Sequence, residues 1–157
     1  MTARSRRWWQ PWAAVAGFAS LLHFCWEMLQ APLYRGMTST PHWEAIVQCA
    51  QATLGDVAIA LAAYAATVPL WGGRWWLGGA SRTCWLSLLG AGLALTIGFE
   101  VVNVYVRHRW AYGPAMPIVL GIGLTPLLQW TLLPPLTVWL ARRHLLGAEM
   151  ILTKPWG

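Results

Sequence analysis

The stretch TCWLSLLGAGLALTIGFEVVNVYV, residues 83–106, carries a single charged side chain, Glu100, within a predominantly apolar run. An α-helix needs roughly 20 apolar residues to cross the hydrocarbon core of a bilayer, and this run exceeds that length. A charge inside such a segment costs about 2.5–3.5 kcal/mol on insertion, so intramembrane carboxylates usually mark a functional site. The stretch therefore predicts a membrane-spanning helix with Glu100 as a candidate site residue.

Three further segments have the same character, and together the four predict an all-α polytopic membrane protein, a four-helix bundle. Connections that contain glycine and proline, which interrupt helices, join the segments. The spans are expected at residues 11–33, 44–70, 83–106 and 116–140. Within the last span, Pro126, Pro134 and Pro135 are expected to remove hydrogen bonds or kink the helix.

The composition excludes an ordinary soluble domain. Of the 157 residues, 57% are hydrophobic and 10% are charged, the mean hydropathy is +0.47, and 13 residues are tryptophan. Soluble domains carry about 25% charged residues. A water-soluble chain of this size could not bury so much apolar surface. We therefore predict one transmembrane domain over residues 1–157, in contact with membrane lipids.

The net charge of +6 comes from basic residues beside the spans, and no aromatic–basic motif typical of nucleic-acid binding stands out. Four spans place both termini on one side, and membrane proteins concentrate basic residues on the cytoplasmic side. Eight basic residues share the side of the termini, against three on the other. We expect a multi-pass bacterial inner-membrane protein with cytoplasmic N- and C-termini. The eight are Arg4, Arg6, Arg7, Arg74, Arg82, Arg142, Arg143 and Lys154, and the three are Arg35, Arg107 and Arg109.

Polar residues recur at helical spacing along the predicted spans, so each set shares one helix face. In the first span, His23, Glu27 and Gln30 follow an i, i+4, i+7 pattern. The sets on the other spans are Gln48 and Asp56; Thr96, Glu100 and Asn103; and Thr125 and Gln129. At a rise of 1.5 Å per residue, all four sets fall in the outer half of the membrane or near its midplane. They predict a polar pocket that opens towards the outer face.

These residue types suit proton transfer. Low dielectric favours the neutral form of a carboxylate, and neighbouring carboxyl groups do not all ionise together, so they share protons. We expect His23 and Glu27 to form an acid/base pair that acts on a lipophilic small molecule, as in an isomerase. Glu100 is expected to stabilise positive charge or share a proton, and Asp56 to support the pair from the midplane. The residues expected to bind substrate are Trp26, Gln30, Asn103, Thr125, Gln129 and Trp130.

Two other classes of protein fit the same sequence. One is a non-catalytic accessory subunit or assembly factor of a larger membrane complex, in which the polar residues serve as interhelical hydrogen-bonding groups. The other is a metal-binding membrane protein, because His23, Glu27, Asp56 and Glu100 offer nitrogen and oxygen ligands that suit zinc, iron or manganese.

The sequence assigns no cofactor. Of the four histidines, His23 alone lies well inside a predicted span, which disfavours a haem with two histidine ligands. The three cysteines, Cys25, Cys49 and Cys84, contain no C-x-x-C pair, which argues against a thiol–disulfide oxidoreductase. We expect the cysteines to be small buried hydrophobic residues.

Several strings resemble small bacterial four-span integral membrane proteins of uncharacterised activity. They are HFCWEMLQAPLY (23–34), GDVAI (55–59), RWAYGPAMP (109–117) and GLTPLLQWTLLPPL (123–136). The resemblance covers most of the spanning region and implies a multi-pass inner-membrane protein.

The site is also similar in its chemistry to that of the emopamil-binding proteins, the sterol isomerases. That family uses a His-x3-Glu helix and a glutamate on a neighbouring helix, in a tryptophan-bearing pocket that holds a sterol-like cation. The matching residues here would be His23, Glu27 and Glu100, with Asn103 and Trp130 as companions. This chain has one span fewer, and Asp56 has no clear counterpart.

Overall fold

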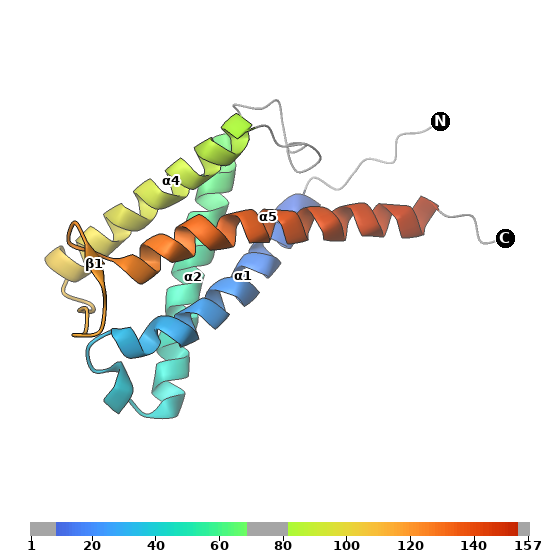
Figure 1. Ribbon diagram of the computed structural model, residues 1–157. Coiled ribbons are helices and arrows are strands. Elements are labelled where there is room, and N and C mark those ends of the chain that lie inside the picture. The colour runs from blue at the N-terminus through green and yellow to red at the C-terminus, as the bar shows by residue number, and fades with distance from the viewer. Residues whose placement is uncertain (1–8, 69–81, 154–157) are drawn as a thin grey trace.

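The computed structural model describes residues 9–68 and 82–153, and it is predominantly helical (Figure 1). The four long helices are α1 (Gln10–Gln30), α2 (His42–Thr67), α4 (Arg82–Glu100) and α5 (Leu124–Thr153). A short 3-10 turn, η1 (Ala31–Leu33), extends α1, and a second one, η2 (Met37–Ser39), precedes α2. A π-helix, η4 (Val101–Val106), continues α4, and two short strands, β1 (Ile118–Val119) and β2 (Ile122–Gly123), precede α5.

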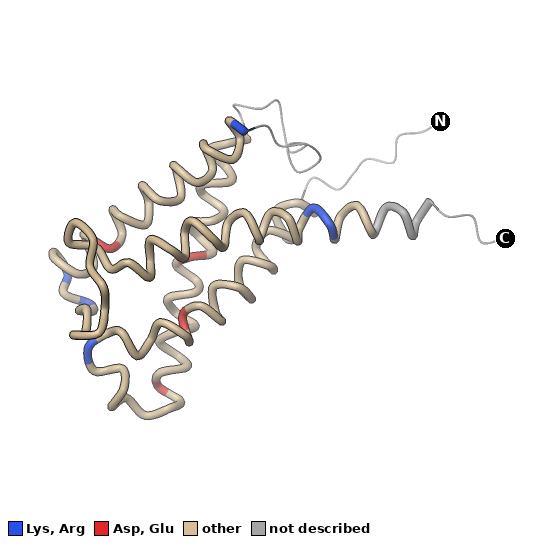
Figure 2. The backbone as a smooth tube through the Cα atoms, in the orientation of Figure 1, with Lys and Arg blue, Asp and Glu red and all other residues tan. Residues whose placement is uncertain are grey.

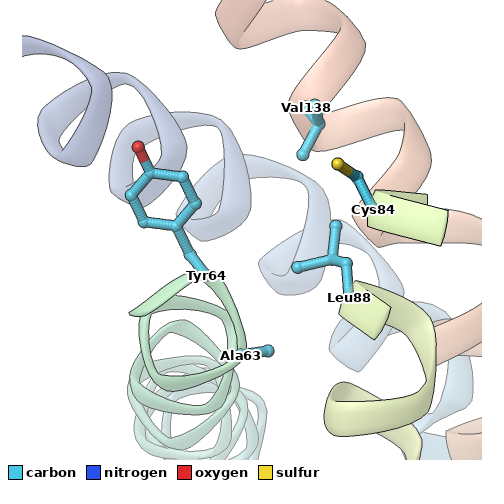
Figure 3. Close-up of a cluster of buried hydrophobic side chains, with 5 residues drawn as sticks. All are labelled: Ala63, Tyr64, Cys84, Leu88 and Val138. Atoms are coloured by element: carbon cyan, nitrogen blue, oxygen red, sulfur yellow. The ribbon is translucent and has the colours of Figure 1, made fainter. Parts of the chain in front are cut away.

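Each long helix packs against two others. α1 contacts α2 and α5, and α4 also contacts α2 and α5, so the helices follow the order α1–α2–α4–α5 around a shared interior (Figure 1). One apolar cluster lies where α2, α4 and α5 meet: Ala63, Tyr64, Cys84, Leu88 and Val138 (Figure 3). The ring of Trp12 on α1 packs edge-on against Tyr64 at a centroid separation of 4.5 Å, so α1 also contacts this cluster.

A second apolar cluster joins Ala19 of α1, Ala60 of α2 and Trp130 of α5. Gly92 of α4 allows the Trp130 indole to enter this space, because a Cβ at position 92 would lie 2.5 Å from the Cε3 atom of the ring. A real Cβ essentially never approaches another heavy atom so closely, so glycine at this position is a packing requirement.

Three of the described helices are long and apolar enough to cross a membrane: Gln10–Leu33, His42–Thr67 and Arg82–Val106. Large apolar side chains on them point outward, for example Leu21, Leu29 and Leu54, which are 66%, 78% and 70% exposed. Such surfaces suit contact with lipid, and the three helices fit the predicted membrane protein. α5 is not among the three, because glutamine, threonine and prolines interrupt its apolar residues.

The predicted bounds agree well with the helices at three positions. Residues 11–33 correspond to α1 with η1, and residues 83–106 correspond to α4 with η4. The predicted span 44–70 corresponds to α2, although residues 69 and 70 lie outside the described residues. The basic residues at positions 4, 6, 7, 74 and 154 that entered the charge count also lie outside them.

The predicted start of the fourth span was wrong. Residues 116 and 117 are not helical, and residues 118–123 form a β-hairpin, in which Ile118 pairs with Gly123 and Val119 pairs with Ile122. Its turn contains Leu120 and Gly121 at positive φ values of 50° and 85°, which is the geometry of a tight two-residue hairpin. The helix that follows begins at residue 124 and continues to residue 153, well beyond the predicted end at 140.

This later start changes the role of one proline. Pro126 falls in the first turn of α5, where a backbone N–H has no intrahelical partner, so it does not interrupt the helix as expected. Pro134 and Pro135 do lie inside α5.

Backbone hydrogen bonds join the segment after α1 to the segment after η4. The Gly113 N–H donates to Leu33 O at 2.8 Å, the Arg35 N–H donates to Ala111 O at 2.9 Å, and Tyr34 forms a β-bridge with Tyr112. A Cβ at position 113 would lie 2.8 Å from Leu33 O, so this approach requires glycine. In Figure 2, the basic residues lie in the connecting segments, at the start of α4 and part-way along α5.

Candidate functional site

The amide of Gln129, on α5, lies at the centre of a group of polar side chains from three helices. Its Nε2 atom is 2.8 Å from His23 Nδ1, 2.8 Å from Asp56 Oδ2 and 3.1 Å from Glu27 Oε1. We call these four residues and Gln30 the acidic cluster. The sequence prediction that α1, α2 and α5 bring their polar faces together is therefore confirmed for these residues.

A donor on α1 fixes the orientation of both amides in the acidic cluster. The Trp26 Nε1–H donates to Gln30 Oε1 at 3.1 Å, and an indole nitrogen can only donate. Gln30 must therefore present its NH₂ group to the other side, where it donates to Glu27 Oε1 at 2.7 Å and to Gln129 Oε1 at 3.2 Å. The oxygen of Gln129 is thereby an acceptor, and its NH₂ group must face the two carboxyl groups and the imidazole.

The acidic cluster combines buried and half-buried members. His23, Gln30 and Gln129 are 0%, 4% and 2% exposed, whereas Glu27 and Asp56 are half-buried at its edge. The two carboxyl groups share one hydrogen-bond donor, the Gln129 NH₂ group. His23 Nδ1 lies 3.4 Å from Asp56 Oδ2, and none of the hydrogen bonds or ion pairs of the two carboxyl groups within the described residues involves lysine or arginine.

Glu100 forms a separate group with the segment that follows η4. Its carboxylate accepts a hydrogen bond from Tyr112 Oη at 2.5 Å and a longer one from Trp110 Nε1 at 3.4 Å, and the residue is 6% exposed. Burial, together with the hydrogen bond to Glu100, raises the pKa of Tyr112, so its phenol keeps the proton that it donates. We call these three residues the Glu100 group.

Tyr34 lies between the acidic cluster and the Glu100 group. Its ring is 5.9 Å from that of Tyr112, and burial followed by the charges of Glu100 and Glu27 raises its pKa. No direct contact between Glu27 and Glu100 is seen among the described residues. The two predicted glutamates therefore belong to separate groups of polar residues.

The site residues predicted from the sequence did not include Tyr34, Trp110 or Tyr112. One signal was available, because Tyr34 follows Glu27 by seven residues and so continues the same helical face. The contacts of Trp110 and Tyr112 with Glu100 depend on how the segment after η4 folds back, and helical periodicity gives no information on such a segment.

The remaining predicted substrate-binding residues lie outside the acidic cluster. Asn103 donates to Phe99 O at 2.8 Å within its own helix, and Thr125 donates to Met116 Sδ at 3.2 Å. Trp130 is 1% exposed, and its ring centroid is 5.3 Å from that of His23. Arg107 is exposed, as expected for a residue at the end of a span. Of the cysteines, Cys49 and Cys84 are buried as predicted, whereas Cys25 is exposed.

Two cavities adjoin these helices. A small one of about 10 Å³ lies beside His23 and is lined by His23, Tyr64, Trp130, Thr137 and apolar neighbours. A larger one of about 410 Å³ lies between α1 and α5 and is lined by Trp9, Phe18, Leu21, His144 and others. Neither of the two is lined by Glu27, Asp56 or Glu100, so the outward-opening pocket stays a prediction.

Within the described residues, no group of three or more histidine, cysteine, aspartate or glutamate side chains is arranged to hold a metal ion. The acidic cluster illustrates why. The Gln129 NH₂ group occupies the position between His23, Glu27 and Asp56 that a cation would need, and it presents hydrogens rather than lone pairs. The geometry therefore gives no support to the metal-binding alternative.

Comparison with known proteins adds no relative. No family model, no curated protein and no solved structure matches this chain.

Proposed function

We propose that α5 is a fourth membrane span and that the protein is a four-helix bundle of the bacterial inner membrane with both termini in the cytoplasm. The packing of α5 against α1 and α4 supports this proposal, because a helix that contributes Gln129 to the interior must run beside two helices apolar enough to span. The excess of basic residues at positions 4, 6, 7, 74, 82, 142, 143 and 154 favours a cytoplasmic location of the termini.

At the acidic cluster, we propose binding of a lipophilic small molecule that carries a positive charge or acquires one during reaction. The observation that carries this proposal is the convergence of Glu27, Asp56 and His23 on the single amide nitrogen of Gln129. Two carboxyl groups that no lysine or arginine of the described residues contacts favour a cationic ligand, because low dielectric strengthens the attraction between opposite charges. The half-buried edge of Glu27 and Asp56 is the part of the cluster that such a molecule can contact.

Proton transfer is the chemistry that the same residues support. In an isomerisation, one carboxyl group would give its proton to a carbon of a substrate double bond, and a neighbouring base would remove a proton from an adjacent carbon. The site would gain one proton and lose one, so no co-reactant is needed. The carboxylate of Glu100, with Tyr112 and Tyr34 beside it, would stabilise the positive charge of the intermediate. This division of roles is similar to that in the emopamil-binding proteins.

The proposal is tested by ligand binding to the purified protein in lipid nanodiscs. The probes are a lipophilic tertiary amine and its uncharged carbon analogue, measured with the wild-type protein and with the Glu27→Gln and Asp56→Asn variants. We expect the wild type to prefer the amine, and each variant to lose about tenfold in affinity, which corresponds to ~1.4 kcal/mol for one charge contact.

Glu44→Gln is the matched control, because Glu44 is an exposed carboxylate at the start of α2. Equal binding of both probes, or equal losses in Glu27→Gln and Glu44→Gln, would contradict the proposal. A protein that carries no small molecule and is stable only together with a partner would support an accessory subunit instead.

A further inference from the structure

The His23 imidazole lies between the acidic cluster and the small cavity. The contacts of its Nδ1 atom with the acidic cluster show which ring nitrogen carries the hydrogen. On the cluster side, Nδ1 lies 2.8 Å from the Gln129 NH₂ group, whose orientation follows from the chain of donors that begins at Trp26. Two N–H donors cannot face each other at that distance, so Nδ1 accepts. A neutral imidazole with an accepting Nδ1 carries its hydrogen on Nε2.

That hydrogen is directed away from the acidic cluster and has no acceptor among the described residues. His23 Nε2 is buried and makes no hydrogen bond within the described residues. The same holds for Trp130 Nε1 and for Thr137 Oγ1. Buried polar groups without partners are uncommon in native proteins, and each costs about 1–3 kcal/mol if it stays unsatisfied.

All three residues line the small cavity of about 10 Å³ between the helices. A volume of about 10–15 Å³ is the minimum for one water molecule, and it is too small for a larger ligand. Two of the three groups are N–H donors, so the occupant must accept two hydrogen bonds. The third group, a hydroxyl, can accept one in return.

We infer that this cavity is a binding site for one water molecule that accepts from His23 Nε2–H and Trp130 Nε1–H and donates to Thr137 Oγ1. Water has two lone pairs and two hydrogens, which matches this set of partners, and three hydrogen bonds are typical of a buried water. The bound water holds the imidazole in the Nε2–H form, so Nδ1 keeps its lone pair at the acidic cluster. Trp130 and Thr137 are thus positioning residues that act through His23.

This inference deepens the proposed function, since it explains how His23 would act as a base towards the acidic cluster. Its test does not require a ligand. Full-length protein in lipid bilayers, with ¹⁵N-labelled histidine and tryptophan, is studied by solid-state NMR in a background in which His23 is the one remaining histidine. The background substitutions are His42→Gln, His108→Asn and His144→Gln.

We expect a directly bonded hydrogen on Nε2, none on Nδ1, and transfer of magnetisation from water to the Nε2 hydrogen and to the Trp130 indole hydrogen. Thr137→Val, which keeps the shape of the side chain and removes the hydroxyl, should greatly weaken the transfer to Nε2. Thr131→Val is the matched control, because Thr131 is exposed on the same helix and bonds to Leu128 O.

A hydrogen on Nδ1, or an Nε2 hydrogen that receives no magnetisation from water in the wild type, would overturn the inference. An effect of Thr131→Val equal to that of Thr137→Val would do the same. Trp130→Phe removes the second donor and should also weaken the transfer to Nε2. If Trp130→Phe does not fold, Thr137→Val alone decides the question. Failure of amine binding would leave this result unchanged, so the two proposals fail separately.

Discussion

Replacing Gln129 by leucine should destabilise the protein more than any other single polar-to-apolar change in the helices. Leucine has a similar size, so the packing of α5 against α1 and α4 is largely kept. The substitution removes the donor that reaches His23 and Asp56 at 2.8 Å and Glu27 at 3.1 Å, and the acceptor for Gln30 at 3.2 Å.

The magnitude follows from burial. His23 is 0% exposed, so its Nδ1 atom cannot turn to water or to a lipid headgroup and should cost about 1–3 kcal/mol when unpaired. The other three contacts are interhelical or edge hydrogen bonds, which average ~0.6 kcal/mol each in membrane proteins and together contribute about 2 kcal/mol. We therefore expect the free energy of unfolding to fall by about 3–5 kcal/mol.

The assay is reversible unfolding in mixed micelles with increasing dodecyl sulfate, followed by tryptophan fluorescence. Gln48→Leu is the control, because Gln48 is exposed on α2 and the same change there should not lower stability. Gln129→Glu tests the donors directly, since it keeps the size of the side chain and replaces the NH₂ group by oxygen. The reasoning is refuted if Gln129→Leu costs no more than Gln48→Leu, or if Gln129→Glu is as stable as the wild type.

Four further outcomes follow from the structure. Gly92→Ala places a Cβ 2.5 Å from an indole carbon and should cost about 1–3 kcal/mol in the same unfolding assay, whereas Gly90→Ala, with nothing within 4 Å, should not. Tyr112→Phe removes the 2.5 Å hydrogen bond to buried Glu100 and should cost about 1–3 kcal/mol; a neutral result would mean that the carboxylate has another donor. Leu120→Gly relieves a positive φ at a fully exposed position and should raise stability by up to ~1 kcal/mol, seen as a higher unfolding midpoint. A reporter enzyme that is active only in the periplasm should be inactive when fused to the C-terminus, and activity there would refute the proposed orientation.

The sequence predicted the spans better than it predicted the connections. Apolar length decides where a helix can cross a bilayer, so the first and third spans were located to within one residue of α1 with η1 and of α4 with η4. The hairpin at 118–123 was assigned to a span because Ile118, Val119, Leu120 and Ile122 are as apolar as the residues of a helix in lipid. Hydropathy does not distinguish an apolar turn from an apolar helix, and the glycine at position 121 was the clearer signal.

In the candidate site, too, the residues on helices were predicted better than those on connecting segments. Helical periodicity correctly grouped His23, Glu27 and Gln30, and the depth of each residue placed Asp56 and Gln129 opposite them. Periodicity could not show that the Gln129 amide would lie between His23, Glu27 and Asp56. It also could not place Tyr34, Trp110 or Tyr112, whose contacts arise from a backbone pairing between two non-helical segments.

The bond between His23 and Gln129 also bears on how the protein is made. The two residues are 106 positions apart in the chain, which at roughly 5–20 residues per second corresponds to a delay of about 5–20 s during synthesis. During that time the nascent chain contains His23 and Glu27 of α1 but not yet Gln129, which forms hydrogen bonds with both. Nascent chains arrested before α5 should therefore stay associated with the insertion machinery or be degraded, and release into the bilayer should await the last helix.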